Sequence, residues 1–306
     1  MNKTLLISGP TATGKTALAV KLAKHFSGEI ISADSRQIYR GMDIGTGKDH
    51  PKNTPIHLID LINPDESFSV AQYQVIAVKL IKEIQLRGKL PIVVGGTGQY
   101  LESLINPEVK TFSIRPNHLL RFILNPLPLF ILQKVYRLLD HQAYFRLNNS
   151  DVQNPHRLIR KIEIKLSLQK PTPVNSKMDF FHLSLTAPNS YLYSRIDKRV
   201  GERLKSGLLQ EISHLLESFS WFDPGLNTLA YKEFKSYISN PDPSLLKKAV
   251  DIWRFDEHHL ARRQKTYLKR LSPDLTIDIS HSLPWVSLIS RITKWYNHNY
   301  EYGTSG

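Results

Sequence analysis

The sequence contains no cysteine among its 306 residues. That absence excludes disulfide bonds, thiolate nucleophiles, iron–sulfur clusters and zinc sites with cysteine ligands. The chain also has no apolar run near the roughly 18 residues that a membrane-spanning helix needs. Its first apolar run ends at Ile7, which is too short for a signal peptide. These absences are compatible with a reducing compartment, and we expect the protein in the cytoplasm.

Acidic residues are scarce relative to basic ones: 27 Asp and Glu face 41 Lys and Arg, which gives a formal net charge of +14. Most of this excess lies beyond residue 105. A basic surface of this size attracts polyanions, of which nucleic acid is the first candidate and an anionic membrane surface the second. We therefore expect a catalytic core in the first third of the chain and a basic binding surface in the rest.

The spacing of apolar residues predicts strands and helices that alternate over the first hundred residues. The expected strands lie at 4–8, 29–33, 56–60 and 90–94, and the expected helices at 16–26 and 69–87. This alternation is typical of a parallel sheet with helices on both faces.

After residue 106 prolines become frequent and helical spacing predominates. The spacing predicts helices at 129–148 and 155–169, a strand at 181–185 that returns to the sheet, and long helices at 190–218 and 244–270. We expect three parts: a catalytic core of residues 1–106 and 180–296, a mostly helical insertion at 107–179, and a frayed polar tail at 297–306.

One segment matches the phosphate-binding pattern G-x-x-x-x-G-K-[ST]. It consists of Gly9, Pro10, Thr11, Ala12, Thr13, Gly14, Lys15 and Thr16. The predicted strand before it and helix after it are the context that the motif requires. Its backbone N–H groups would hold phosphate oxygens, Lys15 would add positive charge, and the Thr16 hydroxyl would bind Mg²⁺. The motif predicts a fold like that of the P-loop NTPases, with magnesium as cofactor.

Two further strand ends carry polar candidates. Asp34 and Asp60 each end an apolar strand, so either could hold Mg²⁺ in a nucleoside-triphosphate hydrolase or kinase. The turn 95–98 contains three glycines, which would let a substrate approach the backbone, and one hydroxyl, that of Thr97. Open α/β sheets bind ligands at the carboxyl ends of their strands. These motifs alone leave the reaction open.

Blocks spread over residues 3–270 resemble the bacterial tRNA dimethylallyltransferases. The blocks lie at 9–16, 31–39, 42–48, 57–60, 68–71, 93–100, 154–163, 195–200, 207–208, 231–233 and 261–267. The run 32–48 is the most specific. The chain departs from the family pattern at Gln99, Ala230 and Tyr267, where the family usually has Leu, Gly and Trp, and the segment 107–150 matches poorly.

The resemblance implies transfer of a dimethylallyl group from dimethylallyl diphosphate to the exocyclic amine of the adenosine 3′-adjacent to the tRNA anticodon. The phosphate loop would then bind a diphosphate. Asp34 would act as general base, Thr97 would hydrogen-bond at the amine or the pyrophosphate, and Arg199 would neutralise the leaving group. The implied tRNA-binding residues are Ser35, Arg36, Gln37, His156, Arg157 and Arg160. Gln37 would make a bidentate contact with an adenine edge. We expect a monomer with no membrane partner.

Three basic stretches, at 155–169, 190–206 and 262–270, are expected to track the phosphates of an anticodon stem-loop. Two alternatives remain open. The first is an adenylate isopentenyltransferase, which would prenylate free AMP, ADP or ATP with the same Lys15 and Asp34. The second is a P-loop kinase or a non-catalytic nucleotide-binding RNA adaptor. A steep fall of activity on tRNA with salt would argue against the first, and ATP hydrolysis would favour the second.

Overall fold

The computed structural model describes residues 2–49, 51, 54–106, 117–167 and 178–298. The chain divides into two compact units, a larger one of residues 1–105 and 176–306 and a smaller one of residues 106–175. The predicted tail falls almost wholly outside the described residues. In the described part of the chain, no helix combines the length and apolar character that crossing a membrane requires.

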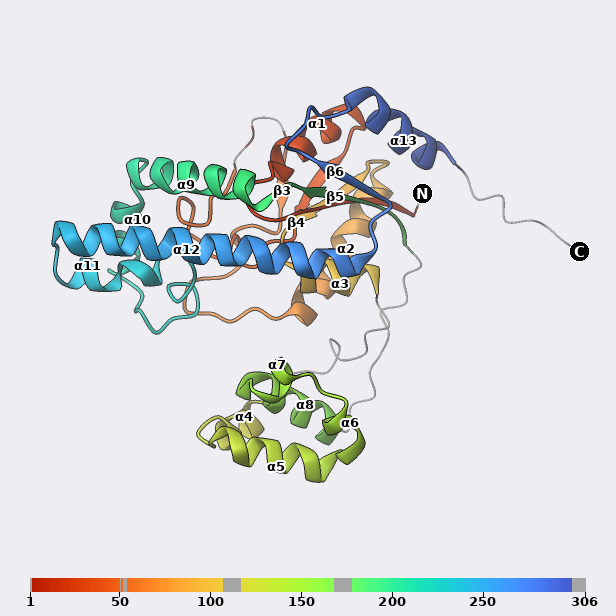
Figure 1. The fold of residues 1–306 in the computed structure, drawn as a ribbon. Helices are drawn as coiled ribbons and strands as arrows, with labels where there is room; N and C mark the ends of the chain where they lie inside the picture. The colour runs from red at the N-terminus through yellow and green to blue at the C-terminus, as the bar shows by residue number, and fades with distance from the viewer. Residues whose placement is uncertain (1, 50, 52–53, 107–116, 168–177, 299–306) are drawn as a thin grey trace, which may run out of the picture. The chain divides into compact units, whose positions relative to one another are not determined.

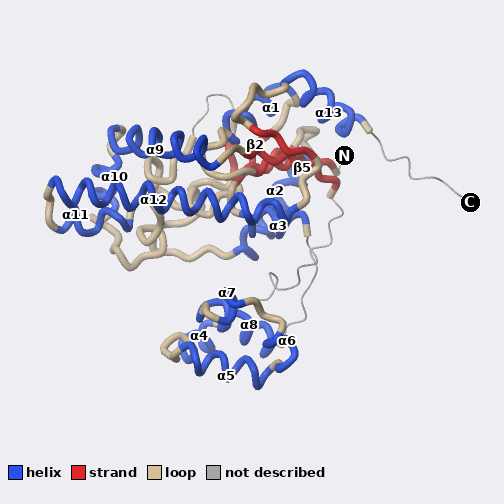
Figure 2. Tube along the Cα trace, viewed as in Figure 1, coloured by secondary structure: helices blue, strands red, loops and turns tan. Residues whose placement is uncertain are grey.

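The larger unit is built on a six-stranded sheet (Figures 1 and 2). Its strands are β1 (Lys3–Ser8), β2 (Glu29–Ser32), β3 (Ile56–His57), β4 (Pro91–Gly95), β5 (Asp179–Thr186) and β6 (Leu275–Asp278). Its α-helices are α1 (Lys15–His25), α2 (Val70–Leu86), α3 (Gly98–Ile105), α9 (Asn189–Lys205), α10 (Leu208–Leu215), α11 (Lys235–Ser239), α12 (Pro243–Leu268) and α13 (Trp285–Asn297). Two short 3-10 turns, η2 (Lys232–Phe234) and η3 (Lys269–Leu271), flank α11 and α12.

The strands pair in parallel in the order β3-β2-β4-β1-β5-β6. Strands β1, β2 and β4 are buried along their whole length, as parallel strands covered on both faces must be. The predicted parallel sheet flanked by helices is thus confirmed. Because β4 lies between β2 and β1, the loops that follow these three strands open side by side at the carboxyl edge of the sheet.

Two predicted elements of this unit are wrong in extent. The strand expected at 56–60 ends at His57, because the next residue, Leu58, has a φ of 62°, which a strand does not accommodate. The single helix expected at 190–218 is two helices, α9 and α10, separated at Gly207 with a φ of 103°. The sequence patterns also gave no prediction of β6 or α13.

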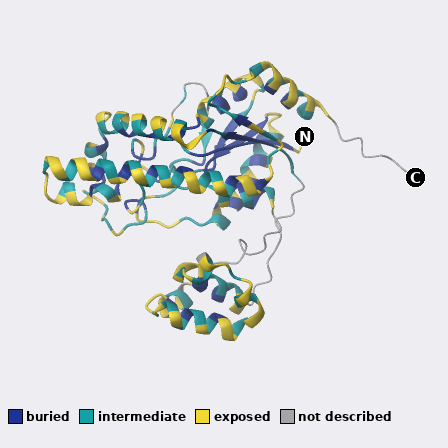
Figure 3. Cartoon of the chain, in the orientation of Figure 1, coloured by how far each residue is buried: buried dark blue, intermediate teal, exposed yellow. Residues whose placement is uncertain are grey.

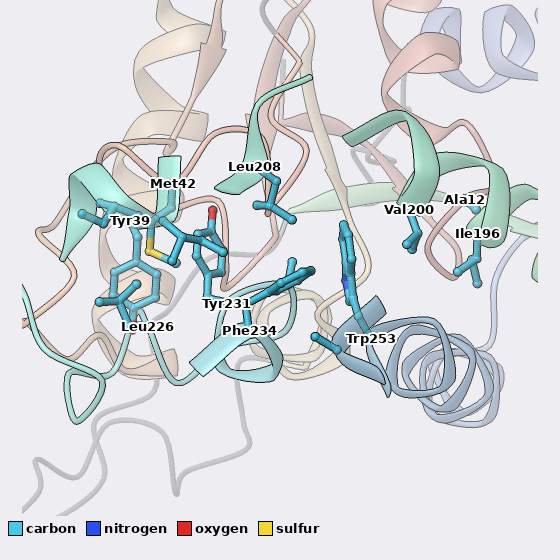
Figure 4. Packing of buried hydrophobic residues seen from close by; sticks show 14 of the residues in the cluster. Ala12, Tyr39, Met42, Ile196, Val200, Leu208, Leu226, Tyr231, Phe234 and Trp253 are labelled. Atoms are coloured by element: carbon cyan, nitrogen blue, oxygen red, sulfur yellow. The ribbon is translucent and has the colours of Figure 1, made fainter. Parts of the chain in front are cut away.

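Among the described residues of the larger unit, two hydrophobic cores bear on the placing of its helices. One contains residues of α1, of the sheet and of α13. The other joins α9, α10 and α12 to the loop after β2, and Figure 4 shows its centre, with Tyr231, Phe234 and Trp253. The rings of Phe234 and Trp253 meet edge to face, with centroids 5.8 Å apart. Figure 3 shows much of the sheet buried and exposed residues along α9 and α12. The second core fixes which faces of α9 and α12 point inward.

The smaller unit is helical in its described part. It contains α4 (His118–Leu124), α5 (Leu129–Leu139), α6 (His141–Phe145), α7 (Asn149–Val152) and α8 (Pro155–Leu166) around a small core of leucine, isoleucine and tyrosine side chains. The helix predicted at 129–148 is wrong in one respect, because Asp140 interrupts it. The Asp140 carboxylate accepts the Ala143 N–H at 3.0 Å and so caps a new helix. The end of the helix predicted at 155–169 lies outside the described residues.

Candidate functional site

The phosphate loop joins β1 to α1 and is closed over itself. Gly14, with a φ of 79°, brings the backbone into the first turn of α1. The Lys15 ammonium donates to the carbonyl of Pro10 at 2.7 Å, and the Thr13 hydroxyl donates to the same carbonyl at 2.8 Å. Lys15, the side chain that the motif predicts to bind phosphate, is therefore held against the loop.

The electrostatic surroundings of Lys15 favour an anion. The pKa of Lys15 is lowered to about 8, mainly by burial and also by the charges of Arg199 and Arg36, against an opposing contribution from Asp34. Burial and neighbouring positive charge both disfavour the Lys15 ammonium, so a bound diphosphate or similar anion would stabilise it.

The arginines of α9 supply most of the surrounding positive charge. They lie four residues apart, and each donates to a loop of the site: Arg195 Nε to the Ala12 carbonyl at 2.7 Å, Arg199 Nη1 to Thr11 Oγ1 at 3.5 Å, and Arg203 Nη1 to the Gly45 carbonyl at 3.1 Å. Arg195 remains exposed, whereas Arg199 and Arg203 are partly buried. The second core orients Arg199 and Arg203 toward the loops, which suits the role of Arg199 at the leaving group, and contact of this stripe with RNA phosphates stays a prediction.

The cations of the site depress one another's affinity for protons. Burial lowers the pKa of Arg203 to about 9, and the neighbouring Arg199 charge contributes. Burial also lowers the pKa of Arg199, again with help from a neighbour, Arg36. Burial is thus the main cause of both shifts, and the neighbouring positive charges add to it, whereas Glu257 and Asp34 raise the pKa of Arg36. Sequence analysis did not identify Arg203 as a site residue.

One buried carboxylate from α12 counters this charge. The Glu257 side chain is 3% exposed, and its Oε1 accepts from Arg36 Nη1 at 3.0 Å. Burial opposes the ionised form of Glu257, but the charges of Arg36 and Arg203 outweigh it and hold the pKa of this carboxyl below its usual value. Sequence analysis missed Glu257. The spacing could have indicated its burial. Glu257 lies four residues after Trp253 and four before Ala261, so the three residues share one face of a helix, and the two apolar neighbours mark that face as buried.

The ends of β2 and β4 are tied together next to the phosphate loop. The Thr97 hydroxyl accepts the Ser35 N–H at 3.0 Å, and the Thr97 N–H donates to the Ala33 carbonyl at 3.2 Å. Asp34 lies between these two anchored residues, and its Oδ1 accepts the Arg36 N–H at 2.9 Å. The structure thus brings Asp34 and Thr97 together at the edge where the phosphate loop opens.

The glycines after β4 make room for side chains of α12 rather than for open space. A Cβ placed on Gly96 would lie 2.4 Å from Gln264 Nε2, and one on Gly98 would lie 2.1 Å from a ring carbon of Tyr267. Gln264 Oε1 also accepts the Thr11 N–H at 2.8 Å. Side chains of α12 thus line this turn, and the approach of a substrate to it stays a prediction.

The predicted base-contacting side chains are engaged within the protein. The Gln37 Nε2 donates to the Gly47 carbonyl at 3.1 Å, and its Oε1 accepts from the Ser32 hydroxyl at 3.1 Å. To make a bidentate contact with adenine, Gln37 would have to give up its hydrogen bonds to Gly47 and Ser32. Arg36 is likewise committed to its ion pair with Glu257.

The remaining predicted tRNA contacts lie on α8 of the smaller unit. His156 is exposed at the first turn. Arg157 Nη1 contacts Asp151 at 2.8 Å, and Arg160 Nη1 contacts the buried Glu163 at 3.1 Å. Positive charge is therefore displayed on α8, although two of its arginines already have carboxylate neighbours.

The second acidic candidate, Asp60, forms an ion pair with Lys48. The buried ammonium of Lys48 also pairs with Asp43. Of the two acidic candidates, Asp34 alone acts on the charge of Lys15. Within the described ranges, no three histidine or acidic side chains are grouped as metal ligands. A magnesium ion bound through substrate phosphates needs only one or two protein oxygens, so the Thr16 hydroxyl at the start of α1 fits such an ion.

Comparison with known proteins finds relatives along nearly the whole chain. A family model described as IPP transferase matches residues 37–271, and one described as isopentenyl transferase matches residues 2–58. The tRNA dimethylallyltransferase of Roseiflexus sp. strain RS-1 is 38% identical, with 89% of this chain and 92% of the relative covered. The crystal structure of the full-length tRNA isopentenylpyrophosphate transferase from Bacillus halodurans is similar with a TM-score of 0.71 and 32% identity, over 96% of this chain and 97% of that one. A eukaryotic dimethylallyltransferase acting on tRNA is similar with a TM-score of 0.79 and 26% identity, over 95% and 77%.

Proposed function

The chain belongs to the IPP transferase family, and on this premise we propose that it transfers a dimethylallyl group from dimethylallyl diphosphate to tRNA. The acceptor is the exocyclic amine of the adenosine 3′-adjacent to the anticodon. The observation that carries the proposal is the gathering of positive charge from Lys15, Arg36 and Arg199 at the phosphate loop, with Asp34 at the adjoining strand end. Such a site suits a diphosphate leaving group beside a proton acceptor.

The reaction forms one carbon–nitrogen bond and breaks one carbon–oxygen bond. The adenine amine attacks the allylic carbon, the electron pair of the broken bond leaves with pyrophosphate, and one amine proton passes to the Asp34 carboxylate. An exocyclic amine is a weak nucleophile because its lone pair is delocalised into the ring. General-base assistance of this kind contributes about 10²–10⁴-fold.

The leaving group gains negative charge as the carbon–oxygen bond breaks. Lys15 and Arg199 are placed to bind that charge, and their depressed pKa values would return toward normal once the anion is present. The Thr16 hydroxyl would hold a magnesium ion, which when bound supplies further charge neutralisation on the diphosphate. Glu257 keeps Arg36 oriented while the site is open.

The tRNA is bound by residues of both units in this proposal. Ser35, Arg36 and Gln37 adjoin the proton acceptor and receive the adenine, which must leave its stack at a cost of a few kcal/mol. On α8, the exposed His156 and the arginines Arg157 and Arg160 contact the stem phosphates. Thr97 positions the Asp34 loop through the Ser35 N–H. We also propose that the protein acts as a monomer.

The test uses purified protein, dimethylallyl diphosphate, Mg²⁺ and tRNA from cells that lack the modification. We expect mass analysis of the digested nucleosides to find dimethylallyl-adenosine, and EDTA to abolish its formation. AMP, ADP and ATP are offered as acceptors in parallel reactions. Prenylated mononucleotide without prenylated tRNA would overturn the proposal in favour of an adenylate isopentenyltransferase. ATP hydrolysis with neither product would favour a P-loop kinase.

A further inference from the structure

Helix α12 reaches the phosphate loop through a single polar side chain. Gln264 Oε1 accepts the backbone N–H of Thr11 at 2.8 Å. The side chain of the same Thr11 contacts Arg199 Nη1 at 3.5 Å, so the glutamine and the arginine flank one residue of the loop. Backbone N–H groups of a phosphate loop are the groups that turn toward the bound phosphate. Gln264 therefore lies beside the phosphate position.

The hydrogen bond to Thr11 fixes the orientation of the Gln264 amide. With Oε1 used as acceptor by the loop, Nε2 and its two N–H groups are directed to the other side. That side faces the turn after β4, because a Cβ on Gly96 would lie 2.4 Å from Nε2. In the described part of the chain, Nε2 makes no hydrogen bond that would use these donors.

Neighbouring contacts hold this part of α12 against the loops. Ala261 and Leu268 are buried on the same helix, and the Lys265 ammonium donates to the Ala187 carbonyl at 2.7 Å. Glu257, two turns earlier, binds Arg36. The backbone at Gln264 is thus anchored on both sides, and its amide lies between Thr11 of the phosphate loop and Gly96 of the turn after β4.

We propose that Gln264 binds the diphosphate: its Oε1 holds the Thr11 N–H, and its Nε2 donates to an oxygen of the diphosphate next to the scissile bond. This inference rests on the proposed function for the identity of the ligand. The neutral amide of Gln264 adds directional hydrogen bonds to a site whose positive charge comes from one lysine and three arginines of the surrounding loops and α9. Because charge develops on the diphosphate during bond cleavage, the contact strengthens in the transition state.

Two substitutions separate the two halves of the amide. Gln264→Glu keeps the acceptor for Thr11, loses both donors and adds a negative charge, whereas Gln264→Met keeps the length and loses acceptor and donors. Gln210→Glu is the matched control, since Gln210 is exposed on α10 and receives the same change of charge. The probe is inorganic pyrophosphate with Mg²⁺, titrated by calorimetry, followed by kcat and KM for dimethylallyl diphosphate at saturating tRNA.

We expect Gln264→Glu to weaken pyrophosphate binding by about tenfold or more, the loss of a hydrogen bond to a charged group. It should lower kcat/KM for dimethylallyl diphosphate at least as much, with tRNA affinity unchanged and a midpoint of unfolding within about 2 °C of the parent. Gln264→Met should lose pyrophosphate affinity by a smaller factor, and Gln210→Glu should behave as the parent.

Parent-like pyrophosphate affinity in Gln264→Glu would overturn the inference and leave Gln264 a packing residue. If both variants unfold, the parent itself decides, through the side-chain amide resonance of Gln264 in ¹⁵N-labelled protein. That resonance should shift on addition of pyrophosphate, and an unchanged resonance overturns the inference. These outcomes do not bear on the proposed function, which is overturned only if the unsubstituted protein does not prenylate tRNA.

Discussion

Asp34 owes its place to the loop that follows β2. Its neighbours are anchored by hydrogen bonds to Thr97, and its own Oδ1 accepts the Arg36 N–H, so the carboxylate has little freedom. We expect Asp34→Asn, which keeps that acceptor, to lower turnover by about 10²–10⁴-fold with tRNA affinity intact. The control is Asp60→Asn, whose carboxylate pairs with Lys48. Single-turnover rates at saturating tRNA measure the effect, and equal rates for the two variants would remove Asp34 from the chemistry.

Lys15 gives a pH-dependent signature of diphosphate binding. Its pKa of about 8 in the open site should rise when an anion binds, so binding near pH 8 takes up a proton at Lys15. At pH 6.5 the ammonium is already protonated and the uptake should vanish. Calorimetry of pyrophosphate binding in buffers of different ionisation enthalpy measures the proton count. The number of protons taken up by the Lys15→Met variant is subtracted from that of the parent, which removes the protons taken up by pyrophosphate itself. If the remaining proton uptake is the same at pH 8 and pH 6.5, Lys15 is not the group that takes up the proton.

At the scale of elements, α9 and α8 carry arginines with different tasks. Arg199 on α9 reaches the phosphate loop, and Arg157 is half-exposed on α8 of the smaller unit. Arg199→Ala should lower turnover at saturating tRNA, because it acts on leaving-group charge that peaks in the transition state. Arg157→Ala should leave that turnover near normal, weaken tRNA binding and reduce the salt slope by about one contact. Both constants are measured for both variants at two salt concentrations, and identical patterns would refute the division of labour.

Helix α12 contributes the counter-charge that lets the arginines stay ionised. Glu257→Gln leaves Arg36 without its carboxylate in a buried place, so we expect a loss of about 3–5 kcal/mol in the free energy of unfolding. Because the pKa of Glu257 is lowered in the folded protein, its contribution is present above the ordinary glutamate pKa and is lost as the pH falls below it. Urea unfolding at pH 7 and at acid pH should therefore show a difference between parent and variant that shrinks with acidity. A constant difference would contradict this reading, and Glu202→Gln on the exposed face of α9 is the control.

At the scale of the whole molecule, the net charge of +14 distinguishes the tRNA acceptor from a free nucleotide. Binding that neutralises several phosphates releases counterions, so log affinity for tRNA should fall linearly and steeply with log salt. Pyrophosphate binding should depend on salt much less, because its contacts are few and buried. Filter binding from about 50 to 200 mM salt measures the first, with calorimetry for the second. Equal slopes for the two ligands would argue against a large tRNA surface.

Local patterns determined much of this protein. The strand, glycine loop and helix around Lys15, the parallel sheet, and the position of Asp34 at a strand end all follow from short-range spacing, which a sequence displays directly. The resemblance carried by residues 32–48 identified the family to which the chain belongs. The roles of the individual site residues remain predictions.

Tertiary structure alone decided which side chains meet. The inward direction of Arg199 and Arg203, the pairing of Glu257 with Arg36, and the contact of Gln264 with Thr11 join residues more than 150 positions apart. Helical spacing says that residues share a face, but the face that is buried depends on what packs against it. Here the core around Trp253 makes that choice, through apolar burial summed over many distant residues, which no local window of sequence contains.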